Sequence, residues 1–97
     1  WALGLVLAEL APDRATQILA RARAYGESRV ICGVHNASAI EGGRIVGASV
    51  VAALHGSPEF RTDLDAARAE LQAARAKAAT SGATCDAENA LVAQPVY

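Results

Sequence analysis

The stretch Glu27–Arg44, ESRVICGVHNASAIEGGR, decides the fold because it holds the end of one predicted helix and the start of the next. Residues 36–38 are typical of a turn. Ser38 and Glu41 form the S-x-x-E pattern of a capping box just before a new apolar run. We therefore expect a helix that begins at Ser38 and continues to about His55, where a histidine suits the C-terminal end of the helix dipole.

The same stretch carries three side chains suited to binding a phosphate group. Arg29 offers a planar fork of donors that can hold two phosphate oxygens, and Ser28 adds a hydroxyl donor. His35 lies just before the predicted helix, whose free N–H groups and dipole favour an anion. A neutral imidazole at this position is also able to attack phosphorus and form a phosphohistidine. The sequence therefore predicts a phosphate site made by these three residues.

Outward from this stretch, apolar residues recur at helical spacing and no strand pattern is present. The serine and proline before Glu59 predict the start of another helix, with an apolar repeat that extends to about Lys77. We expect an all-α fold, a small bundle of about four helices that is part of a larger helical domain. Residues 1–79 form its helical part and residues 80–97 a C-terminal tail. The predicted helices cover residues 1–10, 12 to beyond 26, 38–55 and 58–77.

Three glycines lie inside the helix predicted to follow Ser38, at Gly42, Gly43 and Gly47. Each costs a helix interior about 1 kcal/mol relative to alanine. Close approach of another helix backbone is the expected compensation. The first predicted helix, residues 1–10, is apolar almost all round and needs burial on most of its surface. We expect self-association, or an upstream segment that completes the domain and covers these faces.

Composition excludes several classes of partner. The formal net charge of −1 and the pI near 6.1 give no general attraction to nucleic acid. The longest apolar run, Ile45–Leu54, is ten residues, well short of the roughly 20 that cross a bilayer, so no membrane partner is expected. The two cysteines lack the spacing of metal ligands, and no metal site is expected.

The pattern S-R-x5-H at Ser28, Arg29 and His35 resembles the third signature block of the phosphatidic acid phosphatase type 2 superfamily. That superfamily includes the bacterial class A non-specific acid phosphatases and the vanadium haloperoxidases. The flanking segments GESRVICGVH, EGGRIVGASVVAALH and SPEFRTDLDAARAEL are closest to the class A acid phosphatases. The resemblance covers residues 1 to about 71 and identifies the chain as the C-terminal part of such an enzyme.

The resemblance implies a role for each matching residue. Ser28 and Arg29 resemble the family's phosphate-binding pair, and His35 resembles its nucleophile. The family has an aspartate four residues after this histidine, which orients the imidazole, but this chain has Ala39. Glu41 falls where these phosphatases often carry a second acidic residue. The family's earlier blocks, which supply further phosphate donors and the general acid, are absent from these 97 residues.

These matches and departures imply phosphomonoester hydrolysis through a phosphohistidine in the complete parent enzyme. The chain itself would hold only part of the site and be inactive alone, so its status as an enzyme is left open. One alternative is a non-catalytic helical module, or a pseudoenzyme in which Ala39 records lost activity. A second is a vanadate-binding, haloperoxidase-like site. The ligands implied are phosphate, a phosphomonoester or vanadate, and no cofactor is implied.

The resemblance also bears on cellular location and on the two cysteines. Class A acid phosphatases are exported, so it implies a periplasmic or secreted protein. Oxidising compartments permit disulfides, and we expect a bridge between Cys32 and Cys85. Such a bridge would contribute about 4 kcal/mol on the chain-entropy model.

Overall fold

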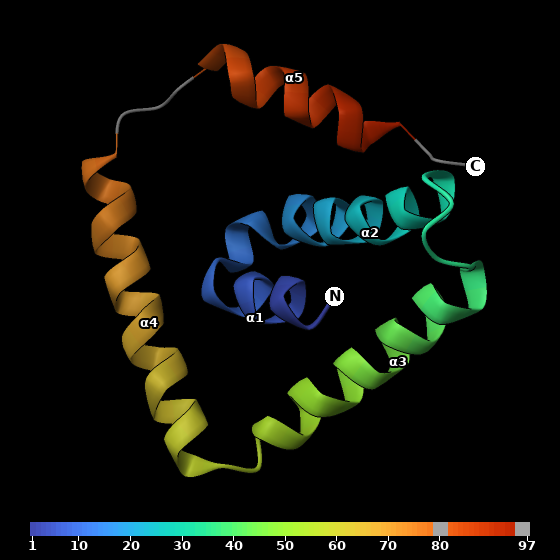
Figure 1. Cartoon of the computed structure of the whole chain (residues 1–97). Helices are drawn as coiled ribbons and strands as arrows, with labels where there is room; N and C mark the ends of the chain where they lie inside the picture. Colours follow the sequence, from blue (N-terminus) through green and yellow to red (C-terminus); the bar gives the residue numbers. More distant parts are fainter. Residues whose placement is uncertain (79–81, 95–97) are drawn as a thin grey trace.

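A computed structural model describes residues 1–78 and 82–94, and in these ranges the chain is all-α with no strand. This confirms the fold class expected from the sequence. The elements are the helix α1 (Ala2–Leu10), the 3-10 turn η1 (Pro12–Arg14), and the helices α2 (Ala15–Ile31), α3 (Ala37–Leu54), α4 (Pro58–Lys77) and α5 (Gly82–Ala93). In Figure 1, α3, α4 and α5 form an open frame around α1 and α2.

Helix α4 has the boundaries that its sequence predicts. The Ser57 hydroxyl accepts a hydrogen bond from the Phe60 N–H at 3.3 Å, and Pro58 occupies the first helical position. Proline is favoured there because that N–H has no partner inside the helix. The helix ends at Lys77, where the backbone of the next residue becomes extended.

The start of α3 corrects the predicted capping box. The cap is Asn36, whose side-chain oxygen accepts from the Ala39 N–H at 2.8 Å. The Ser38 hydroxyl donates to the same Asn36 oxygen, and Glu41 pairs with Arg44. The reason is that Asn36 is the last residue with extended backbone, so Ser38 already lies inside the first turn.

A fifth helix lies where we expected the tail after residue 79. Helix α5 runs beside α2, and Glu88 pairs with Arg21 at 3.2 Å across the two helices. Several alanines in this segment favour helix once α2 offers a surface to lie on. We also expect residues 94–97 to be extended from their sequence, and of these residues 95–97 lie outside the described residues.

Helix α1 is the centre of the fold, since it contacts α2, α3 and α4. Its backbone approaches its neighbours closely at two glycines. Gly4 faces the Cβ of Ala22 on α2, and Gly47 on α3 lies against the backbone nitrogen of Ala2. Of the three glycines in α3, only Gly47 shows the expected close approach, because nothing lies within 4 Å of a Cβ built at Gly42 or Gly43.

Polar contacts fasten the long helices to the α1 end of the molecule. The Arg68 guanidinium donates two N–H groups to the Glu9 carbonyl, both at 3.2 Å. At the C-terminal end of α3, the His55 Nε2 lies 2.9 Å from a Glu9 carboxylate oxygen. Arg75 binds Asp13 at 2.6 Å, and this hydrogen bond lowers the pKa of Asp13 below its ordinary value. That pair therefore stays charged throughout the neutral range.

The apolar core is thin. Only Ala11, Val51 and Leu64 are buried hydrophobic residues in the described part of the chain. Helix α3 leaves much of its apolar side exposed, with Ile45 and Val46 both about 60% accessible. Over 18 residues this helix has a mean hydropathy of 1.3 and meets the length and composition of a membrane span. The run of ten residues, Ile45–Leu54, on which no membrane partner is expected, is only part of this helix. Only 6% of the 18-residue window is buried inside the structure.

The two kinds of glycine environment predict opposite effects of alanine. Gly4→Ala places a Cβ 2.5 Å from the Ala22 Cβ. Overpacking of this kind costs about 1–3 kcal/mol, which exceeds the gain in helix propensity. Gly42→Ala enters open space and should raise the unfolding free energy by about 0.5–1 kcal/mol. Urea unfolding of both variants checks this, and equal effects would show that α1 does not pack closely on α2.

Candidate functional site

The C-terminal end of α2 is shaped by a glycine-dependent turn. Gly33 has a φ of +72°, a conformation that glycine adopts without steric cost. Its N–H donates to the Val30 carbonyl at 2.9 Å, and the Val34 N–H donates to the Arg29 carbonyl at 3.1 Å. These two bonds form a Schellman motif, which ends a helix by pairing its last free carbonyls.

The same turn fixes the position of His35 relative to Arg29. The His35 N–H also donates to the Arg29 carbonyl, at 3.1 Å. Asn36 then caps α3 at once, so His35 lies against the N-terminal end of α3. The five residues between Arg29 and His35 are therefore the last two residues of α2 and the three residues that follow them in the Schellman turn. This spacing places an arginine and a histidine at the junction of two helices, near the positive end of the α3 dipole.

Arg29 and His35 open onto one pocket between α2 and α3. Its volume is about 640 Å³. Ala39, where the family resemblance would place an aspartate, is also among the lining residues. The lining residues are Trp1, Ala22, Tyr25, Gly26, Arg29, Val34, His35, Ala39, Ile40, Gly43 and Arg44.

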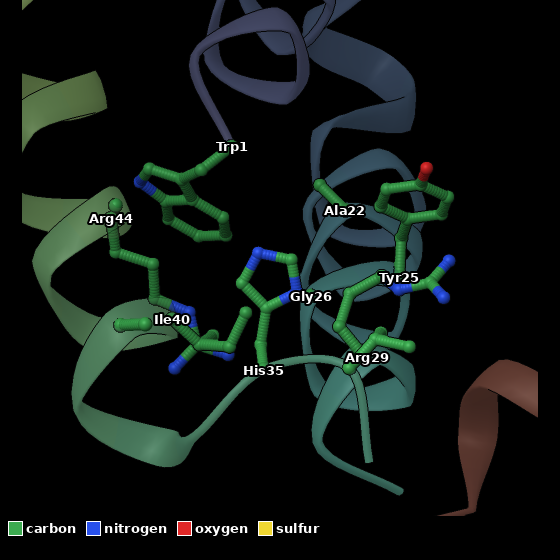
Figure 2. A pocket seen from close by; sticks show the side chains of 11 residues that line it. Trp1, Ala22, Tyr25, Gly26, Arg29, His35, Ile40 and Arg44 are labelled. Carbon is green, nitrogen blue, oxygen red and sulfur yellow. The ribbon is translucent and has the colours of Figure 1, made fainter. Parts of the chain in front are cut away.

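Figure 2 shows how the two predicted side chains lie in this pocket. The imidazole of His35 points into the space beside Trp1, and the side chain of Arg29 turns toward Tyr25. Within residues 1–78 and 82–94, neither side chain has a hydrogen-bond partner. The Arg29 guanidinium points away from the His35 ring in this view, so one ligand held by both groups would require the Arg29 side chain to turn.

Ser28 is not brought to this pocket. Its hydroxyl donates to the Tyr25 carbonyl at 2.7 Å, one turn earlier in α2. It is absent from the residues that line the pocket. A serine near a helix end commonly bonds back to such a carbonyl. Its role in binding phosphate stays a prediction, which would require the hydroxyl to rotate away from this bond.

No carboxylate orients the His35 ring in the described part of the molecule. Ala39 presents only a methyl group to the pocket. Glu41, the second acidic position, is 63% exposed and pairs with Arg44 at 3.2 Å. His55, the second histidine, pairs with Glu9 at the far end of α3.

Three further residues at this site, Trp1, Glu27 and Arg44, are not predicted from the sequence. The Arg44 guanidinium lies 5.9 Å from the centre of the Trp1 ring, and both residues line the pocket. Glu27, which is 5% exposed, pairs with Arg44 at 3.2 Å. Glu27 is the residue that could have indicated this pair from the sequence. An acidic residue near the junction of two helices needs a cationic partner if it is buried.

The structure does not form the expected bridge between Cys32 and Cys85: no disulfide joins the two residues, and both are exposed. Cys32 ends α2, whereas Cys85 lies near the start of α5, which runs in the same direction along α2. Glu88 pairs with Arg21, eleven residues before Cys32. Eleven residues of helix span about 16 Å. Because Cys85 precedes Glu88 on α5, it is separated from Cys32 by more than this length, which is far more than a disulfide can bridge.

Among the described residues, no group of three potential ligands could hold a metal ion.

Comparisons with known proteins point to one group of enzymes. The chain is 46% identical to an acid phosphatase of Zymomonas mobilis over 80 residues, which are 82% of this chain and 30% of that protein. It is 46% identical to a non-specific acid phosphatase of Providencia stuartii over 70 residues, and 45% identical to one of Salmonella typhimurium over 69. These cover 72% and 71% of this chain, and 28% of each relative. No family model and no solved structure matches the chain.

Replacement of Gly33 tests whether the Schellman turn positions His35. Gly33→Ala forces a side chain into a left-handed conformation, at a cost of about 1–2 kcal/mol, although nothing crowds the added Cβ. We expect lower stability and faster amide hydrogen exchange at Val34 and His35. Gly42→Ala, which also meets open space, is the control. Unchanged exchange at both amides would show that the turn does not hold the histidine.

Proposed function

Because the chain is a homologue of bacterial acid phosphatases over about 30% of their length, we propose that it carries part of a phosphomonoester-hydrolysing site. The supporting observation is the shared pocket of Arg29 and His35, with the His35 backbone bonded to the Arg29 carbonyl. A guanidinium and an imidazole at one anion-favouring helix end suit a tetrahedral phosphate.

The proposed chemistry assigns one step to each side chain. Arg29 binds two nonbridging oxygens of the phosphoryl group and offsets the charge that develops on them. The unprotonated ring nitrogen of His35 attacks phosphorus, so that an N–P bond forms and the P–O bond to the alcohol breaks. The departing alcohol takes a proton from a general acid outside this chain. Water then attacks phosphorus and gives a proton to the conjugate base of that acid, the N–P bond breaks, and phosphate and neutral His35 are released.

We further propose that these 97 residues bind phosphate but turn over phosphomonoesters poorly. The chain spans only 28–30% of the relatives it matches, so the remaining donors and the acid belong to other parts of the parent enzyme. Ala39 supports the same conclusion, because nothing at this position holds the His35 tautomer. The relationship to these bacterial phosphatases also supports a periplasmic or secreted location, as the family resemblance implies.

One observation favours a second function, a non-catalytic phosphate-binding module. Ala39 removes the carboxylate that would orient the imidazole, while the pocket, Arg29 and His35 remain. In this alternative the chain, even with its missing part restored, binds the anion without hydrolysis. The two functions therefore agree on binding and differ only in turnover.

Vanadate binding tests the assignment of Arg29. The parent chain should bind vanadate, and Arg29→Ala should weaken that binding at least about tenfold, because a charge-assisted hydrogen bond contributes about 1.5–3 kcal/mol. Arg14→Ala is the matched control, since Arg14 is 63% exposed and lies outside the pocket. Isothermal titration with vanadate measures all three proteins. Equal affinity of Arg29→Ala and the parent would refute the site.

Restoring the carboxylate separates catalysis from binding. We expect Ala39→Asp to raise aryl phosphate hydrolysis at least about a hundredfold in a chain joined to the upstream part of the Zymomonas mobilis relative. Loss of the orienting aspartate in a serine protease costs about 10⁴ in rate, although that chemistry differs. Ala39→Asn is the isosteric control without charge. If neither variant exceeds the alanine form, the non-catalytic module is the better description.

A further inference from the structure

The only charged residue buried among the described positions is Glu27, with 5% of its surface exposed. One of its carboxylate oxygens lies 2.6 Å from the Arg23 Nε and 3.2 Å from an Arg44 terminal nitrogen. A carboxylate withdrawn from water is costly unless cations and hydrogen bonds compensate it. Both arginines therefore stabilise Glu27, but they do so from different elements.

The two arginines differ in what they connect. Arg23 lies one turn before Glu27 on α2, so this pair stays within a single helix. Arg44 lies on α3, seventeen residues further along the chain. Its other terminal nitrogen pairs with Glu41 at 3.2 Å, and its guanidinium lies over the ring of Trp1. The bond from Glu27 to Arg44 therefore ties α2 to α3 across the junction that carries His35.

The ion pair between Glu27 and Arg44 lies close to the site. Glu27 is two residues before Arg29 on α2, and Arg44 itself lines the pocket. Figure 2 shows Arg44 and Trp1 on one side of the His35 imidazole and Arg29 on the other. Apart from this ion pair, contact between the two helices here includes Gly26, where an added Cβ would lie 3.4 Å from Ile40.

We propose that Glu27 and Arg44 form a positioning pair that holds α3, and with it His35, in place relative to Arg29. This inference rests on the proposed phosphate site. We assign Arg44 a positioning role because each of its terminal nitrogens pairs with a carboxylate, and these carboxylates offset its charge. The pair thus supplies rigidity at a junction where Ala39 leaves the imidazole without a carboxylate of its own.

Arg44→Met and Arg23→Met are a matched pair of variants, because each removes one cation from the same carboxylate. The Arg44–Glu27 pair joins α3 to α2, whereas the Arg23–Glu27 pair is four residues apart on α2. Two measurements report on position without any ligand: amide hydrogen exchange of Val34 and His35, and nuclear Overhauser contacts between the His35 and Trp1 rings. A third is vanadate affinity. We expect Arg44→Met to speed exchange at His35 and weaken vanadate binding, each by about tenfold, because small misplacements at a site are costly. Arg23→Met should change both less than twofold.

Exchange at Leu64 on α4 distinguishes positioning from general stability. A merely stabilising role would accelerate Leu64 and His35 equally, and that result would overturn the proposal, as would equal effects of the two Met variants. If Arg44→Met does not fold, Glu27→Gln and Arg44→Lys take its place, with Arg44→Lys expected to retain part of the affinity. If the parent binds no vanadate, the proposed function fails, while the exchange and ring contacts still decide the positioning role.

Discussion

The fold depends on how closely one short helix approaches its neighbours. Helix α1 contacts α2, α3 and α4, and Gly4 and Gly47 are the positions where backbones come together. With only three buried hydrophobic residues in the described ranges, there is little core elsewhere to orient the longer helices. Small residues at these crossings therefore do what large apolar side chains do in a thicker domain.

Polar contacts orient the helices in the regions where no apolar core is present. Glu9 is the example at one end of the molecule, since its carbonyl receives Arg68 and its carboxylate receives His55. Glu27 is the example at the other end, where it is bound by arginines from α2 and α3. Exposed ion pairs contribute little to stability, but a buried carboxylate strongly specifies its partners. The charges in this chain thus fix orientation more than they add free energy.

The sequence predicted those features that depend on neighbouring residues. Helix α4 follows from its serine–proline start, and the proximity of Arg29 and His35 follows from their spacing. Features for which two residues could fill the same structural role were predicted less well. Asn36 caps α3 in place of Ser38 because both side chains suit a cap and only backbone geometry decides. The pairing of Glu27 with Arg44 joins residues seventeen apart, and helical periodicity carries no information about such contacts.

The Schellman turn after Arg29 changes what the spacing in S-R-x5-H means. The five intervening positions form the end of α2 and the turn that leads into α3. Among them, only Gly33 has a backbone conformation that favours glycine. The same short segment therefore carries the two site residues and the turn that ends α2. A relative with different residues between its arginine and histidine would keep the same architecture if its helix ended at the same position. A residue in the left-handed conformation would also have to follow the helix.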